Sequence, residues 1–100
     1  MPLGVFCLFA AAGCRVWEHR SGGLPARVGA PEINTLYSTV GAGDAMHAGF
    51  TISRWVQELD CLSAARFGQA AAAAAVSSPE GTRGVTREAV GKLFSAMTAF

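Results

Sequence analysis

Residues 38–51 combine a glycine-rich turn with an acidic residue, and this is the part of the sequence best suited to chemistry. The turn is Gly41-Ala42-Gly43, and Asp44 follows it directly. The backbone N–H groups of Ala42, Gly43 and Asp44 can converge on one point, because glycines permit the required backbone angles and a close approach by a ligand. The positive end of a following helix would strengthen the local field. The sequence therefore predicts an anion site of the kind that binds phosphate groups.

Asp44 itself has two interpretations. Beside a phosphoryl group, its carboxylate can accept the proton of an attacking hydroxyl while the N–H groups stabilise the negative oxygens. Alternatively, it can cap a helix by accepting hydrogen bonds from the free N–H groups of the first turn. The spacing of the turn leaves both interpretations open.

The elements that hold this turn in place follow from the hydrophobic pattern. Residues 4–9 predict a buried strand, and residues 14–18, 27–28 and 33–37 are further extended candidates. From Gly43 onward the apolar period becomes helical. One stripe, which we expect to be the buried face, contains Ala45, Ala48, Ile52, Val56 and Leu59, and the opposite polar stripe contains His47, Thr51, Arg54 and Glu58.

Two more helices are predicted after this one. Asp60 or Ser63 can cap a helix that runs through the alanines at 70–75, and the segment Ser77-Ser78-Pro79 ends it. The alanines allow this helix to lie very close to its neighbours. Thr86 can cap a last helix, whose apolar face comprises Val90, Leu93, Phe94 and Met97.

The composition is unusual for an independent small monomer. Of the 100 residues, 51% are hydrophobic and only 15% are charged, whereas about 25% charged residues is typical. A small domain exposes a large share of its residues and should need more polar ones. We therefore expect exposed apolar surface through which the chain associates with itself or with a complementary chain.

Charge and cysteine content exclude several classes of function. The net charge of +1, with no block of basic residues, gives no support to nucleic-acid binding. Cys7, Cys14 and Cys61 are an odd number without C-x-x-C spacing, which predicts free thiols in a reducing compartment and no metal site. The apolar residues 1–13 lack a preceding positive charge and are shorter than the roughly 20 residues of a membrane span. We therefore predict a cytoplasmic protein that does not bind membranes.

The string STVGAGDAMHAGFT at residues 38–51 resembles the C-terminal signature of the PfkB (ribokinase-like) family of carbohydrate kinases. Residues 66–93 look like the closing helix, nucleotide-side loop and last helix of that family. Ser38-Thr39-Val40 and Gly81-Thr82-Arg83 are most similar to the phosphofructokinase branch, which includes 1-phosphofructokinase and tagatose-6-phosphate kinase.

The resemblance implies an α/β fold, namely the C-terminal part of a three-layer α/β/α sandwich with short strands followed by three helices. Residues 1–100 would form a partial kinase domain, with strands at about 4–37, the anion-hole motif at 38–51 and helices at about 43–98. The resemblance also implies that Asp44 is the general base and that Gly41, Ala42 and Gly43 form the anion hole for the γ-phosphate. The implied partners are Mg-ATP and a sugar or sugar phosphate.

Further ligand contacts are implied by the resemblance. Ala10, where glycine is usual in the family, and Gly13 fall in a turn over the ATP phosphates. Gln69 falls where many members place an asparagine near the adenine. Gly81, with the carbonyls near Ser38 and Val40, falls near the family's monovalent cation sites. Arg83 is either a phosphate-pairing residue or an exposed loop arginine.

The resemblance covers only the C-terminal third of a complete kinase, without its sugar-binding residues. Two hypotheses follow. The chain is the nucleotide-binding and catalytic-base segment of an ATP-dependent sugar kinase, inactive as an isolated chain. Alternatively, it is a truncated, catalytically inactive remnant that acts at most as an interaction module.

Overall fold

The computed structural model describes residues 5–8, 14–17, 26–33 and 35–98. Within these ranges, three short strands precede three α-helices. The order of short strands followed by three helices is the predicted one. The strands are β1 (Val5–Leu8), β2 (Cys14–Trp17) and β3 (Ala26–Val28). The helices are α1 (Ala42–Thr51), α2 (Cys61–Val76) and α3 (Arg87–Thr98). A π-helical turn, η3 (Ile52–Val56), continues α1, and a 3-10 turn, η4 (Gly81–Gly84), lies between α2 and α3.

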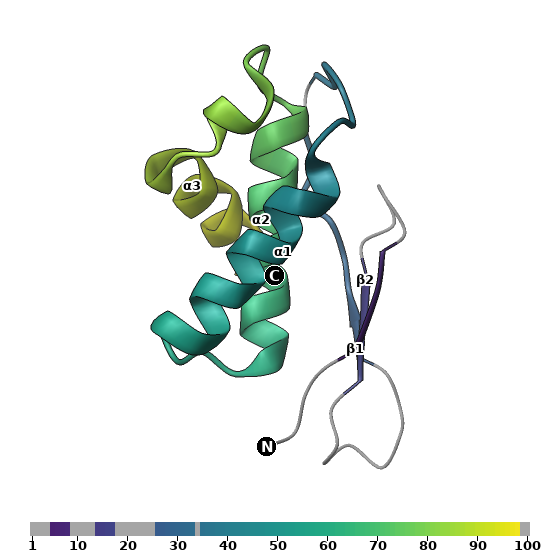
Figure 1. Cartoon of the computed structure of the whole chain (residues 1–100), viewed down its shortest axis with the longest axis vertical. Coiled ribbons are helices and arrows are strands. Elements are labelled where there is room, and N and C mark those ends of the chain that lie inside the picture. The colour runs from purple at the N-terminus through teal and green to yellow at the C-terminus, as the bar shows by residue number, and fades with distance from the viewer. Residues whose placement is uncertain (1–4, 9–13, 18–25, 34, 99–100) are drawn as a thin grey trace.

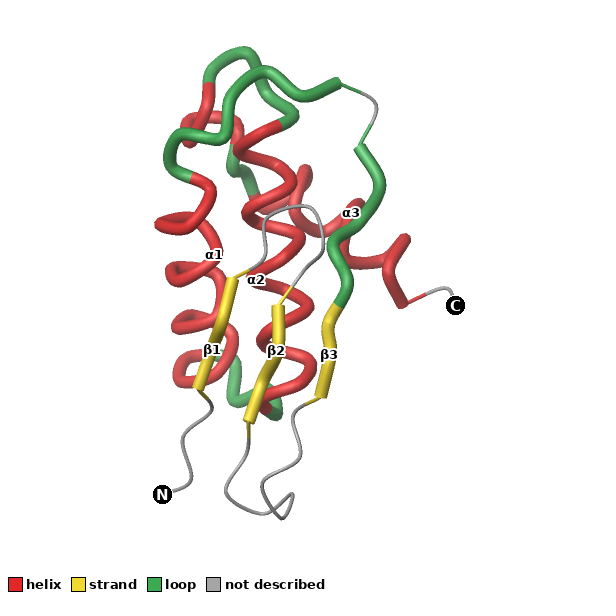
Figure 2. The backbone as a smooth tube through the Cα atoms, turned by 90° about the vertical axis from the view of Figure 1, so that its right-hand side faces the viewer, coloured by secondary structure: helices red, strands yellow, loops and turns green. Residues whose placement is uncertain are grey.

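The strands form an antiparallel sheet in the order β1-β2-β3. Val5 pairs with Trp17 across the first two strands, and Cys14 pairs with Val28 across the last two. Figure 2 shows the sheet lying along α2, and Figure 1 shows α1 and α2 between the sheet and α3. The helices therefore cover one face of the sheet.

The extended segment predicted at 33–37 forms no strand in its described residues, so that prediction is wrong. The N–H of Tyr37 donates instead to the carbonyl of Val76 at the end of α2, at 2.8 Å. The last carbonyls of a helix have no partner within the helix, so they can accept such a bond. This contact ties the segment before the glycine turn to α2.

Two glycines set the close packing of α1 against α2, which run antiparallel (Figure 1). A Cβ added at Gly49 would lie 3.0 Å from the Cβ of Ala71 and 3.1 Å from the Cα of Gly68. One added at Gly68 would lie 2.7 Å from the backbone oxygen of Met46. The two helix backbones therefore approach as closely as they do only because these side chains are missing.

The predicted buried stripe of the first helix is wrong in part. Ala45 is buried, but Ala48 is exposed, and Ile52 and Val56 are 48% and 73% exposed. The residues that face the protein interior are Ala45, Met46, Gly49, Phe50 and Ser53. Close approach at Gly49 selects this face, which a count of apolar residues does not detect. The π-helical bond from the N–H of Gln57 to the carbonyl of Ile52, 3.0 Å, also shifts the later residues out of an α-helical period.

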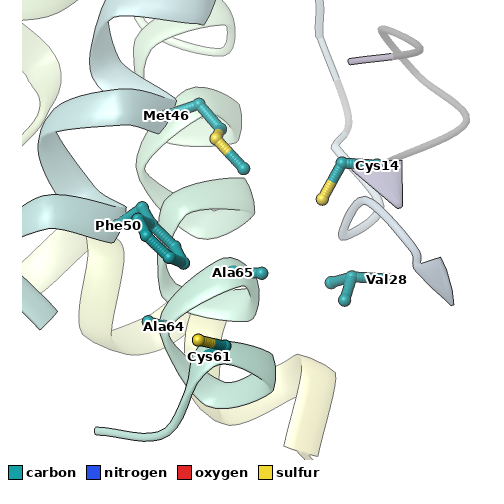
Figure 3. Packing of buried hydrophobic residues seen from close by; sticks show 7 residues of the cluster. All are labelled: Cys14, Val28, Met46, Phe50, Cys61, Ala64 and Ala65. Atoms are coloured by element: carbon teal, nitrogen blue, oxygen red, sulfur yellow. The ribbon is translucent and has the colours of Figure 1, made fainter. Parts of the chain in front are cut away.

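The core between sheet and helices contains small and sulfur-bearing side chains. Figure 3 shows Cys14 and Val28 on the strands facing the side chains of α1 and α2. The buried members of this cluster are Cys14, Val28, Met46, Phe50, Cys61, Ala64 and Ala65. A second cluster joins α2 to α3, where Val90 packs on alanines and the rings of Phe67 and Phe94 lie 5.5 Å apart.

The predicted caps of the last two helices are present. Asp60 precedes α2 and accepts a hydrogen bond from the N–H of Ser63 at 3.0 Å. Thr86 precedes α3 and accepts one from the N–H of Ala89 at 3.1 Å. Among the residues described, no helix has both the length and the apolar character needed to cross a membrane.

Candidate functional site: the glycine turn and Asp44

The glycine turn is a type II β-turn. The carbonyl of Thr39 accepts a hydrogen bond from the N–H of Ala42 at 3.2 Å, which closes the turn. Gly41 occupies its third position with φ 85° and ψ −2°. A type II turn requires a positive φ at this position, and glycine adopts it without strain. Gly41 therefore shapes the turn from which α1 begins.

A second constraint on Gly41 comes from a residue far away in the sequence. A Cβ at Gly41 would lie 2.7 Å from the Cγ2 of Thr82, which belongs to η4. Gly81, which the family resemblance places near a monovalent cation site, is the first residue of η4 and has a φ of 62°. The fold thus brings the late loop into contact with the glycine turn.

The first turn of α1 presents backbone donors. The first bond of the helix runs from the N–H of Ala45 to the carbonyl of Gly41, at 2.9 Å. Because the opening N–H groups of a helix have no acceptor within it, those of Gly43 and Asp44 need partners elsewhere, and no described residue accepts from them. Two adjacent donors at the positive end of a ten-residue helix suit a phosphate oxygen.

The predicted role of Ala42 requires a correction. The sequence predicts that its N–H is one of three convergent donors, but in the structure this N–H closes the turn by donating to the carbonyl of Thr39. Spacing alone could not show this, because a tight turn uses one of its own amides to hold its shape. The donors that the structure leaves for a ligand are those of Gly43 and Asp44.

Asp44 lies in the first turn of α1 with an exposed side chain. The residue that caps α1 is Gly41, and no side chain makes a capping hydrogen bond there. Within the described part of the chain, the carboxylate of Asp44 has no hydrogen-bond or ion-pair partner. The capping interpretation of Asp44 therefore does not apply to this structure. Its carboxylate is available beside the two backbone donors.

Gln69 lies in the core, with only 4% of its surface exposed. Burial raises the pKa of the Cys14 thiol, and a hydrogen bond with the Gln69 side chain partly offsets that increase. Gln69 thus links α2 to the first residue of β2. A contact between Gln69 and adenine stays a prediction, and the structure gives this side chain a packing role.

The other candidate residues are spread around the turn or lie outside the described ranges. Ala10 and Gly13 fall outside those ranges. Ser38, Val40 and Arg83 are all exposed; Ser38 lies just before the turn, Val40 lies within it, and Arg83 lies in η4. His47 is exposed on α1, as expected. In the ranges described, no three His, Cys, Asp or Glu side chains come together in a way that could hold a metal ion.

Sequence reasoning missed two contacts that build the site, from Thr82 to Gly41 and from Tyr37 to Val76. Both join residues about forty positions apart, and neither residue type signals its partner. Together they hold the segment before the turn and the loop η4 beside one another. The resulting arrangement pairs a carboxylate with two amide donors, a combination that can accept a proton and stabilise a transferred anionic group.

Comparison with known proteins identifies the family of the chain. The model of the pfkB family of carbohydrate kinases matches residues 10–87. No curated protein sequence matches the chain.

Solved structures share the fold. Phosphofructokinase-2 from Escherichia coli, determined in complex with potassium, is 25% identical, with a TM-score of 0.79 over 95% of this chain. Arabidopsis thaliana ribokinase, determined with ribose and ATP, is 24% identical over 91% of this chain, also with a TM-score of 0.79. A microbiome-derived acarbose kinase is 27% identical over 92% of it, with a TM-score of 0.74. The chain spans 29%, 28% and 31% of the lengths of these proteins, respectively.

Proposed function

Because the chain belongs to the pfkB family of carbohydrate kinases, we propose that it supplies the terminal-phosphate site and the catalytic base for ATP-dependent phosphoryl transfer to a sugar or sugar phosphate. The observation that carries this proposal is the exposed carboxylate of Asp44 beside the N–H groups of Gly43 and Asp44, which donate to no residue that the structure describes. The likeness to phosphofructokinase-2 supports the predicted phosphofructokinase branch.

In the proposed reaction, Asp44 accepts the proton of the acceptor hydroxyl as its oxygen attacks the γ-phosphorus of ATP. The new O–P bond forms while the bond between the γ-phosphorus and the β,γ-bridging oxygen breaks, so ADP leaves with the electron pair of that bond. The N–H groups of Gly43 and Asp44 donate to the oxygens of the transferred group. Their fixed orientation stabilises the transition-state charge without reorganisation.

Features of the glycine turn also support binding of the ATP phosphates there. Gly41 gives the turn its positive φ, and the amides of Gly43 and Asp44 at the start of α1, which have no acceptor among the described residues, are donors of the kind that phosphate oxygens accept. Mg²⁺ bound to ATP would supply charge neutralisation, and it is commonly held by phosphates and water with one or two carboxylates. We assign no metal ligand in this chain. The monovalent cation near Ser38, Val40 and Gly81 is part of the same proposal.

The test is Asp44→Asn in the protein at its natural length, assayed for ADP release with a panel of sugars and sugar phosphates. Since asparagine keeps the size but cannot take the proton, we expect turnover to fall about 10²- to 10⁴-fold, with nucleotide affinity nearly unchanged. Asp60→Asn is the matched control, because Asp60 is an exposed acid at the start of a different helix, and asparagine is an equally good cap. An Asp44→Asn protein that turns over at the wild-type rate would exclude Asp44 as the base.

The same assay tests the alternative that the chain is catalytically inactive and acts as an interaction module. That alternative is favoured by the exposed apolar side chains of Ile52, Trp55 and Val56, which are 48%, 48% and 73% exposed. The alternative predicts that the wild-type protein transfers no phosphoryl group to any acceptor.

A further inference from the structure

We propose that Ser38 is a positioning residue of the phosphate site, whose hydroxyl fixes the turn that presents the amides of Gly43 and Asp44. This inference rests on the proposed function and assigns a side chain that acts through the backbone. Ser38 does not itself need to touch the nucleotide.

The geometry places Ser38 at the entrance of the turn. Its Oγ accepts a hydrogen bond from the N–H of Val40 at 3.1 Å. One residue later, the carbonyl of Thr39 accepts from the N–H of Ala42 at 3.2 Å. These two bonds hold the residues on either side of Gly41, so together they set the direction in which α1 starts.

The side chains of the residues just before Gly41 contribute little packing to this corner. The side chain of Val40 is 80% exposed, and Ser38 and Thr39 are exposed as well. Before Gly41, where Thr82 packs, the backbone therefore depends on local hydrogen bonds, and serine hydroxyls commonly make such bonds to the N–H two residues on. Removing the Ser38 hydroxyl would therefore loosen the turn without opening a cavity.

Loss of the Ser38 hydroxyl should disturb the alignment of the amide donors more than the stability of the protein. Donors that stabilise a transferred phosphoryl group must already point at its oxygens, since small misalignments reduce catalysis. The bond from Val40 to Ser38 also occupies an N–H that would otherwise be free at the turn. Ser38 thus helps to leave Gly43 and Asp44 as the donors that face the ligand.

The experiment compares Ser38→Ala with Ser38→Thr in the protein at its natural length. Alanine removes the acceptor, whereas threonine retains a hydroxyl at the same carbon. We expect Ser38→Ala to weaken binding of the ATP analogue AMP-PNP and to lower kcat, each by about threefold to tenfold, the effect of losing one ordinary hydrogen bond. We expect Ser38→Thr to restore both to within about twofold of the wild type.

Thr86→Ala is the matched control. The Thr86 hydroxyl also accepts a backbone N–H, that of Ala89, at 3.1 Å in an exposed position, but it does so at the start of α3. This variant should lower the stability of the protein and leave AMP-PNP affinity and kcat unchanged. A purely structural role for Ser38 would give the same pattern as Thr86→Ala.

The outcomes separate this inference from the proposed function. A wild-type protein that binds AMP-PNP but transfers no phosphate would overturn the role of Asp44, and the affinities of the Ser38 variants would still test Ser38. Unchanged affinity and kcat in Ser38→Ala would overturn the positioning role. So would a Ser38→Thr protein as impaired as Ser38→Ala, because the hydroxyl would then not be the group that matters.

Discussion

Replacement of Gly68 by alanine tests the helix packing that supports the site. Gly68 lies in the middle of α2, where a Cβ would come within 2.7 Å of the backbone oxygen of Met46 on α1. Ordinary contacts of a Cβ begin at about 3.4 Å. A backbone oxygen cannot rotate away, so α1 and α2 must separate by several tenths of an ångström.

The size of the effect follows from two opposing contributions. Alanine is favoured over glycine in a helix interior by about 1 kcal/mol. Overpacking of a well-packed core by one added carbon costs about 1–3 kcal/mol. Since the obstacle at Gly68 is backbone and not a flexible side chain, we take the upper part of this range. The net expectation is a loss of about 1–2 kcal/mol in the free energy of unfolding.

Gly91→Ala is the control for this prediction. Gly91 lies in α3, and a Cβ there would meet no atom within 4 Å. The same substitution should therefore raise the free energy of unfolding by about 0.5–1 kcal/mol, because only the helix propensity acts. Denaturant unfolding of both variants at equal protein concentration measures the difference.

The two variants should move in opposite directions. If Gly68→Ala stabilises the protein as much as Gly91→Ala does, the close approach of α1 and α2 is not a real constraint. Gly68→Ala should also lower turnover, because Met46 is two residues beyond Asp44 on the helix that would be displaced. Stability that falls without any change in turnover would show that the site tolerates this shift.

Two further predictions concern helix ends. Glu58 is the one non-glycine residue with a positive φ, 58°, within the described ranges. Glu58→Gly should therefore raise the free energy of unfolding by about 0.5–1 kcal/mol. The reason is that relief of roughly 1–2 kcal/mol of backbone strain exceeds the conformational entropy that glycine loses on folding. A destabilised variant in thermal unfolding would show that Glu58 is not strained. Asp60→Ala should cost about 1 kcal/mol at pH 7 through loss of the α2 cap. Hydrogen bonds from Ser63 lower the pKa of Asp60, so the cap's contribution is full above the ordinary pKa, near 3.9, and is lost as pH falls through the lower folded-state pKa. The stability gap between wild type and Asp60→Ala should therefore shrink below about pH 4, and a constant gap down to pH 2 would argue against a carboxylate cap.

The local features of the sequence predict much of the secondary structure. The apolar run at residues 4–9 and the alternating segment at 14–18 predict two strands, and both are present. Asp60 and Thr86 act as the expected caps, because capping depends on one side chain and the N–H three residues on. These interactions are local, so residue type and spacing are sufficient to predict them.

The buried face of α1 could not be predicted in the same way. An apolar stripe through Ile52 and Val56 suggests one face, but the contact with α2 occurs where Gly49 and Gly68 allow the backbones to approach. Burial of a helix face depends on what packs against it. Hydrophobic periodicity describes only one of the two partners.

The sequence by itself predicted an anion site, because glycines precede an acidic residue at the start of a helix, and it left the role of Asp44 open between a base and a helix cap. Only the tertiary structure decided which groups remain available: the amide of Ala42 closes the turn, those of Gly43 and Asp44 find no acceptor in the described part of the chain, and Thr82 lies against Gly41. The physical reason is that residue type sets which bonds a group can make. Which bonds it does make depends on the neighbours that the fold brings to it.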